Sequence, residues 1–195
     1  MIKKLLIGAV VASILQFVWS GISYKALTWH QGTMESFKDE AAMVKALNAN
    51  APKPGIYVLP NPSPQNAPTD PEQKKAWEEK CKAMWAAGPV VFAAVSPGTD
   101  PSMKKQFGGA LAIGALAGVV MTWLLFSVGL PGYWQRVRFV VTVALAAAVL
   151  INLPYMNWWG FTRAYTRVQN ADLLISWAIT GMALAKLTAG GKKKR

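Results

Sequence analysis

Residues 106–135 read QFGGALAIGALAGVVMTWLLFSVGLPGYWQ, a stretch without any charged side chain. An α-helix that crosses a bilayer needs about 20 consecutive apolar residues. This stretch therefore predicts a membrane-spanning helix from Phe107 to Leu130. Pro131 and Gly132, which follow it directly, are a helix-ending signal.

Three further apolar runs predict three more spans, at Leu5–Tyr24, Phe139–Met156 and Leu173–Gly190. The first run also fits a secretory signal peptide, but its length and poor cleavage site favour an uncleaved anchor. The last run contains Lys186 near its end, where an ammonium group can reach the lipid headgroups. An interfacial helix is the alternative for that run.

The predicted fold class is a membrane all-α protein, a four-transmembrane-helix bundle with a small extracytoplasmic α/β module between its first two spans. The expected divisions are 1–27 (first transmembrane helix), 28–105 (module), 106–190 (three-helix transmembrane region) and 191–195 (basic cytoplasmic tail). The strands and helices of the module are expected at Glu35–Asn48 (helix), Ile56–Leu59 (strand), Pro71–Ala86 (helix, Asp70 as N-cap) and Val90–Val95 (strand). This order permits two parallel strands with a crossover helix.

The net charge of +12 does not indicate nucleic-acid binding, because the excess basic residues lie beside the apolar runs. Only 15% of residues are charged, against about 25% in soluble domains. Basic residues mark the cytoplasmic side of membrane proteins. The distribution thus predicts an inner-membrane, multi-pass protein with both termini cytoplasmic and residues 28–105 periplasmic, on the basis of Lys3, Lys4, Arg136, Arg138 and Lys192–Arg195.

Few residues in the chain suggest chemistry. His30, the only histidine, is a ligand to a haem or pigment, an interfacial polar residue, or a hydrogen-bonded link to the module. Asp172 is expected to cap the fourth helix with Asn170 nearby, which leaves the predicted spans without an acid and argues against ion-coupled transport. With one cysteine, Cys81, and one histidine, no metal site is predicted; no catalytic residue and no required cofactor are predicted either.

Two groups of residues are candidates for polar or lipid contacts. Gln16 and Asn152 are the strongest polar groups inside the predicted spans, and they suggest either interhelical hydrogen bonds or substrate contacts. An expected outer loop, 157–172, joins aromatic and basic residues that suit lipid headgroups or an aromatic belt: Trp158, Trp159, Arg163 and Arg167.

Small residues recur at intervals of four in three of the predicted spans. Such stripes let helix backbones approach closely. The stripes are Ala110, Gly114 and Gly118 in the second span, Ala144 and Ala148 in the third, and Gly181 and Ala185 in the fourth. They predict tight helix packing, within one chain or between subunits.

The segments WH at 29–30, FKDE at 37–40, NAP at 50–52 and GIYVLP at 55–60 resemble a group of small bacterial inner-membrane proteins. The resemblance covers residues 1–62. It implies a bacterial inner-membrane location, and no activity is assigned to that group.

The preferred function from these observations is a non-catalytic accessory or assembly subunit that contacts the lipid bilayer and other membrane proteins. The alternative is a small transporter or lipid-binding protein. Two lesser alternatives are a haem- or pigment-binding subunit through His30, and an enzyme acting on a lipid with His30 or Asp172 as base.

Overall fold

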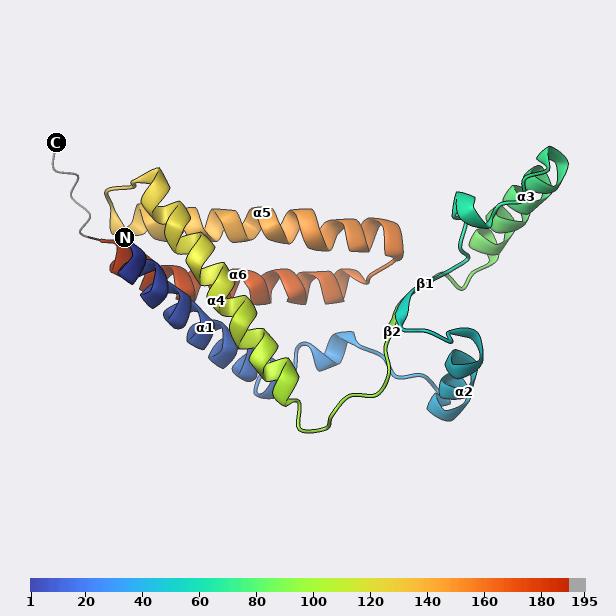
Figure 1. Cartoon of the computed structure of the whole chain (residues 1–195), viewed down its shortest axis with the longest axis horizontal. Helices are drawn as coiled ribbons and strands as arrows, with labels where there is room; N and C mark the ends of the chain where they lie inside the picture. Colours follow the sequence, from blue (N-terminus) through green and yellow to red (C-terminus); the bar gives the residue numbers. More distant parts are fainter. Residues whose placement is uncertain (190–195) are drawn as a thin grey trace. The chain divides into compact units, whose positions relative to one another are not determined.

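The computed structural model describes residues 1–189, and its described part contains six α-helices and one two-stranded sheet (Figure 1). The elements are α1 (Ile2–Lys25), η1 (Gln31–Thr33), α2 (Glu40–Asn50), β1 (Gly55–Leu59), η2 (Pro64–Asn66), α3 (Pro71–Ala87), β2 (Val91–Val95), α4 (Lys104–Val128), α5 (Tyr133–Trp159) and α6 (Arg163–Thr188). The predicted tail 191–195 lies outside the described residues.

The chain folds as two compact units. The helical unit comprises Met1–Glu35, Asp100–Asn157 and the described chain from Phe161 onward. The second unit, called the module below, comprises Ser36–Thr99 with Trp158–Gly160.

Four helices of the helical unit are long and apolar enough to cross a membrane, which confirms the four predicted spans as candidates. α6 is the least apolar of the four. Lys186 lies in the last turn of α6, where it was expected. The described chain therefore has the organisation of a multi-pass membrane protein.

α1 and α4 lie side by side because glycines on α4 let the two backbones meet. A Cβ on Gly114 would lie 2.9 Å from the Cα of Ser13, and one on Gly118 would lie 2.5 Å from the Cβ of Ala12. The Ser13 hydroxyl also donates to the carbonyl of Leu111 at 2.8 Å. Small residues thus position α1 directly against α4.

α1 runs antiparallel to α4, and α5 runs antiparallel to α6. Phe17 near the end of α1 meets Phe107 near the start of α4, with ring centroids 5.7 Å apart. On α6, the late residue Gly181 faces Val140 early in α5, while Asn170 bonds Asn152 late in α5. The start of α1, the α4–α5 connection and the end of α6 consequently share one end of the helical unit (Figure 1).

The apolar core of the helical unit lies toward that end. It consists of Met121 and Leu125 of α4, Val140 of α5 and Leu184 of α6. Away from that end, α4 diverges from α5 and packs along α1 (Figure 1). The short α4–α5 connection therefore does not produce a helical hairpin paired along its whole length.

The fourth span was predicted to start too late. α6 begins at Arg163, with the Thr162 hydroxyl accepting a hydrogen bond from the backbone N–H of Tyr165 at 3.1 Å. The polar residues before Leu173 hid the helical pattern, because their partners lie on other helices and not within the segment. Asp172 therefore does not cap the helix; it lies inside it.

The module contains its predicted helices and strands, but the strands do not adopt the parallel arrangement that their order permits. β1 and β2 pair antiparallel, with Tyr57 opposite Ala93. The order of elements left this open, because a connection as long as the one between these strands can return in either direction. Asp70 caps α3 as predicted, accepting from the N–H of Gln73 at 2.9 Å.

Candidate functional site

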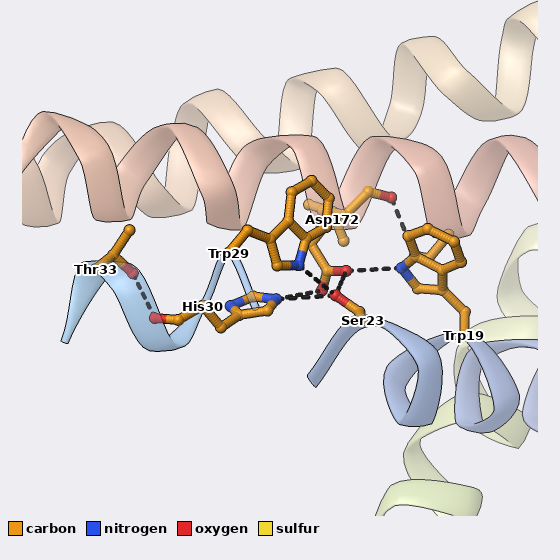
Figure 2. A network of polar contacts seen from close by, with 8 residues as sticks. Trp19, Ser23, Trp29, His30, Thr33 and Asp172 are labelled. Carbon is orange, nitrogen blue, oxygen red and sulfur yellow. Dashed lines mark hydrogen bonds and ion pairs between the residues drawn. The ribbon is translucent and has the colours of Figure 1, made fainter. Parts of the chain in front are cut away.

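The most connected polar side chain of the helical unit is Ser23, near the end of α1 and fully buried. Its Oγ lies 2.5 Å from Oδ1 of Asp172 on α6, 3.0 Å from Nε2 of His30 and 2.9 Å from Nε1 of Trp29. Trp19 Nε1 donates to the same Oδ1 at 2.7 Å. Figure 2 shows these side chains converging from α1, the Thr28–His30 turn and α6.

The donor and acceptor roles in this network follow from the serine hydroxyl. A hydroxyl has one hydrogen and two lone pairs. The hydrogen is donated to Asp172, and the Trp29 indole N–H takes one lone pair. His30 must therefore donate from Nε2 into the other lone pair, so this nitrogen carries a proton. Every hydrogen-bonding position of Ser23 is used.

The three residue types Ser, His and Asp invite comparison with a hydrolase triad, but the geometry differs. In a triad the serine donates to histidine, and the other ring nitrogen faces the carboxylate. Here Ser23 donates to Asp172, and Nε2 of His30 faces both groups, lying 3.7 Å from Oδ2 of Asp172. Histidine cannot activate the hydroxyl in this arrangement, so the network does not favour lipid-cleaving chemistry.

His30 itself is 1% exposed. Its ring stacks on Tyr24 with centroids 3.8 Å apart and is edge-on to Trp29. A haem iron must reach a ring nitrogen to bind it, whereas Nε2 is bonded to Ser23 and the whole residue is buried. The surroundings of His30 suit a buried link between the Thr28–His30 turn and the helices better than a cofactor ligand. Within residues 1–189, no group of three or more His, Cys, Asp or Glu side chains is placed to hold a metal ion.

A cavity of 510 Å³ lies beside this network, and α1, α4, α5 and α6 all contribute to its wall. Its polar lining includes Asp172, Gln16, Asn152 and Gln169. A smaller cavity of 230 Å³ shares Asn152 and Gln169 with it. No acid was predicted inside a span, but the structure brings Asp172 to a cavity lined by all four long helices.

Gln16 and Asn152, singled out from the sequence, both bridge helices. The Gln16 amide donates to the Thr180 hydroxyl at 2.9 Å, and the Asn152 amide donates to the Asn170 side-chain oxygen at 2.6 Å. Each leaves its own carbonyl oxygen as an acceptor.

The expected outer loop is almost entirely helical, which corrects that prediction. Trp158 and Trp159 form the last turn of α5, and Arg163 and Arg167 lie in the first turns of α6. Both arginines are exposed, and Arg167 donates from Nε to the carbonyl of Arg163 at 3.2 Å. Gly160, in the short connection, adopts φ +70°, a left-handed conformation suited to glycine.

The small residues of the predicted stripes have different locations. Gly114, Gly118, Gly181 and the alanines at 144, 148 and 185 are buried in helix contacts. Ala110 is exposed and lines the 510 Å³ cavity. Ser23, Trp19 and Trp29 were missed as site residues, because an isolated serine or interfacial tryptophan carries no sequence signal for a long-range contact.

No protein-family model, curated protein sequence or solved structure matches this chain.

Proposed function

We propose that this protein is a non-catalytic accessory or assembly subunit of a larger membrane complex, with its module binding a partner outside the cytoplasm. The observation that carries the proposal is the module's lack of a core of its own. Among its described side chains only Pro60 and Cys81 are buried. Large apolar side chains are exposed instead, such as Phe37 at 64%, Ile56 at 61% and Val44 at 57%.

The lack of a core is physically unusual for a unit of this size. A two-stranded sheet is marginally stable in water unless a hydrophobic face packs on something else. In the described module the strands pair with each other, and neither α2 nor α3 makes an extensive contact with the sheet. Apolar side chains that gather on an exposed surface are typical of protein-interaction sites.

The proposed orientation places the Met1 end, the α4–α5 connection and the end of α6 in the cytoplasm of a bacterial cell. It is supported by the basic residues there, including Lys3, Lys4 and Arg138, and by the antiparallel packing that puts these segments at one end.

The test is affinity purification of the tagged full chain from its native membranes in mild detergent, followed by mass spectrometry. We expect a stoichiometric set of other membrane subunits. A variant carrying Phe37→Ser and Ile56→Thr should lose these subunits, because the substitutions remove apolar contacts to the partner. Both side chains are exposed in the described chain, so the variant should still fold. Leu150→Ala on α5, 74% exposed, is the matched control and should retain them. Recovery of the chain alone from wild-type membranes would remove this proposal.

A second candidate function, binding of a lipid or small substrate as in a transporter, is favoured by the cavity beside Asp172. Its volume lies within the range of about 300–1,000 Å³ typical of small-molecule sites. Mass spectrometry of lipids retained by the purified protein tests it: a cavity-filling Ala110→Trp variant should retain less lipid than wild type, and an unchanged lipid content would contradict it.

A further inference from the structure

The polar groups around the 510 Å³ cavity include hydrogen-bond acceptors from three helices. Gln16 and Asn152 each commit one amide hydrogen to Thr180 and Asn170, and each keeps its carbonyl oxygen and a second amide hydrogen. Asp172 adds a carboxylate, which can only accept. A ligand with N–H or O–H donors matches these oxygens.

The carboxylate also lacks a lysine or arginine partner among the described residues. Its one ion-pair contact there is His30, at 3.7 Å. Oδ1 accepts from both Trp19 and Ser23, whereas Oδ2 has only that longer contact. Arg167, five residues earlier on α6, bonds the backbone of its own helix. The Asp172 side chain is 19% exposed, so its charge is open to a cation from the cavity.

Aromatic rings complete the lining. Phe17, Trp19 and Trp177 all border the cavity. Aromatic faces attract ammonium groups, and tryptophan is the strongest of them. A cavity that combines aromatic rings with one carboxylate therefore matches a protonated amine better than an anion or a neutral sugar.

The depth of Asp172 suits the head of an amphiphile. α6 spans 26 residues, so it is about 39 Å long, longer than the hydrocarbon layer of about 30 Å. Asp172 lies nine residues after Arg163, about 13 Å along the helix. If the excess length projects on the Arg163 side, the carboxylate lies about one turn inside the apolar layer, within reach of a headgroup amine.

We propose that the cavity beside Asp172 binds the protonated amine head of an amphiphile, with the carboxylate as counter-ion. The inference rests on the second candidate function and adds the ligand class. Two sources share this chemistry, an ethanolamine phospholipid and a free long-chain amine.

The experiment uses the full chain in nanodiscs of choline phospholipid, with two arms. The first adds ethanolamine or glycerol phospholipid of identical acyl chains and counts bound lipids by native mass spectrometry. The second adds dodecylamine or dodecanol and follows tryptophan fluorescence. We expect at least tenfold tighter binding of the ethanolamine lipid over the glycerol lipid, or of dodecylamine over dodecanol; the arm that responds identifies the source.

Variants test the site itself. Asp172→Asn should abolish the preference, and Asp100→Asn, an exposed carboxylate outside the spans, should not. Because Asp172 also belongs to the Ser23 network, Asp172→Asn can fail to fold. Two further variants then provide the test: Ala110→Trp, which obstructs the cavity from an exposed position, and Gln169→Leu. The control is Leu116→Trp, at an exposed position outside the cavity lining.

Equal binding of the amine probe and of its hydroxyl counterpart in both arms would overturn the inference. So would an amine preference that survives both Ala110→Trp and Gln169→Leu. If Ala110→Trp loses all bound lipid but the wild type shows no amine preference, this inference is removed. The second candidate function then still stands.

Discussion

At the scale of single residues, Ser23 links the end of α1 to the nearby Thr28–His30 turn and to α6, which is distant in the sequence. Its hydroxyl receives the N–H groups of Trp29 and His30 and donates to Asp172 on α6. Because the serine is fully buried, no water can replace it as the acceptor for those two donors. Removal of a buried acceptor costs more than the net value of its hydrogen bonds, since its partners stay desolvated.

Ser23→Ala should therefore lower the free energy of unfolding by about 1–3 kcal/mol. Thermal unfolding of the purified protein in detergent, followed by circular dichroism, measures this. Ser127→Ala on α4, where an exposed hydroxyl bonds its own helix at the Trp123 carbonyl, is the matched control and should have almost no effect. Equal stability of the two variants would show that the network contributes nothing.

The Asn152–Asn170 bond at 2.6 Å should couple α5 and α6 energetically. A double-mutant cycle with Asn152→Ala and Asn170→Ala should yield an interaction energy of about 0.6 kcal/mol, and at most about 1.7 kcal/mol, as is typical between membrane helices. The cycle is measured by denaturant titration in mixed micelles. Strictly additive single effects would mean that the bond is not formed in solution.

At the scale of elements, the contact between α1 and α4 depends on glycine. Gly8 of α1 lies directly against the Thr122 side chain of α4, and a Cβ on Gly118 would lie 2.7 Å from the Gly8 carbonyl oxygen. Within residues 1–189, Thr122 Oγ1 is the one buried side-chain oxygen or nitrogen without a hydrogen-bond partner. Its position against the Gly8 backbone suits a weak Cα–H···O contact instead.

Gly118→Val should force α1 away from α4 and destabilise the helical unit by at least about 1–3 kcal/mol, the usual cost of overpacking. Gly109→Val on the same helix is the control, because no atom lies within 4 Å of a Cβ there. Both variants carry the same loss of glycine, so their difference in melting temperature reports the steric clash alone. Similar melting temperatures would contradict the α1–α4 contact.

The module's helix α3 should depend on its cap. Asp70→Ala removes the acceptor for the Gln73 N–H and should cost about 1 kcal/mol of local stability. Hydrogen exchange over the first turn of α3 should then accelerate roughly fivefold. Asp39→Ala, which removes the equivalent cap of α2, should accelerate exchange in α2 and leave α3 unchanged.

At the scale of the whole molecule, the chain separates a tightly packed helical unit from a module that buries few of its described side chains. Among α1, α4, α5 and α6, each helix runs opposite to the one before it. The chain therefore crosses the bilayer in alternating directions if all four span it. The basic residues Lys3, Lys4, Arg136 and Arg138 then share one side. This arrangement agrees with a cytoplasmic location for that side.

Single cysteines in a Cys81→Ala background test the orientation. A membrane-impermeant maleimide added to intact cells should label Ala49→Cys in the module and should label Trp134→Cys only after lysis. Both positions are exposed in the described chain. The reverse pattern would invert the proposed topology, and labelling of both in intact cells would mean that the chain does not span the membrane four times.

The apolar helices and the helix cap could be predicted without a structure, because both depend on residues close together in the chain. The uncharged run 106–135 and the Asp70 cap needed no tertiary information. The start of α6 and the direction of β1 against β2 did need it. Polar residues such as Asn170 become compatible with a helix once Asn152 approaches from α5, and strand direction depends on how a long connection returns.

The candidate site was still less accessible to sequence reasoning. Asp172 was predicted to be a helix cap, and the partners of His30 could not be identified from the sequence. The packing of α1 against α6 brings Ser23, His30 and Asp172 together although 149 residues separate the serine from the aspartate. Hydropathy and periodicity describe what one segment prefers, whereas a hydrogen bond between two segments depends on the positions of both. Only the tertiary structure therefore turned these isolated polar residues into one network beside one cavity.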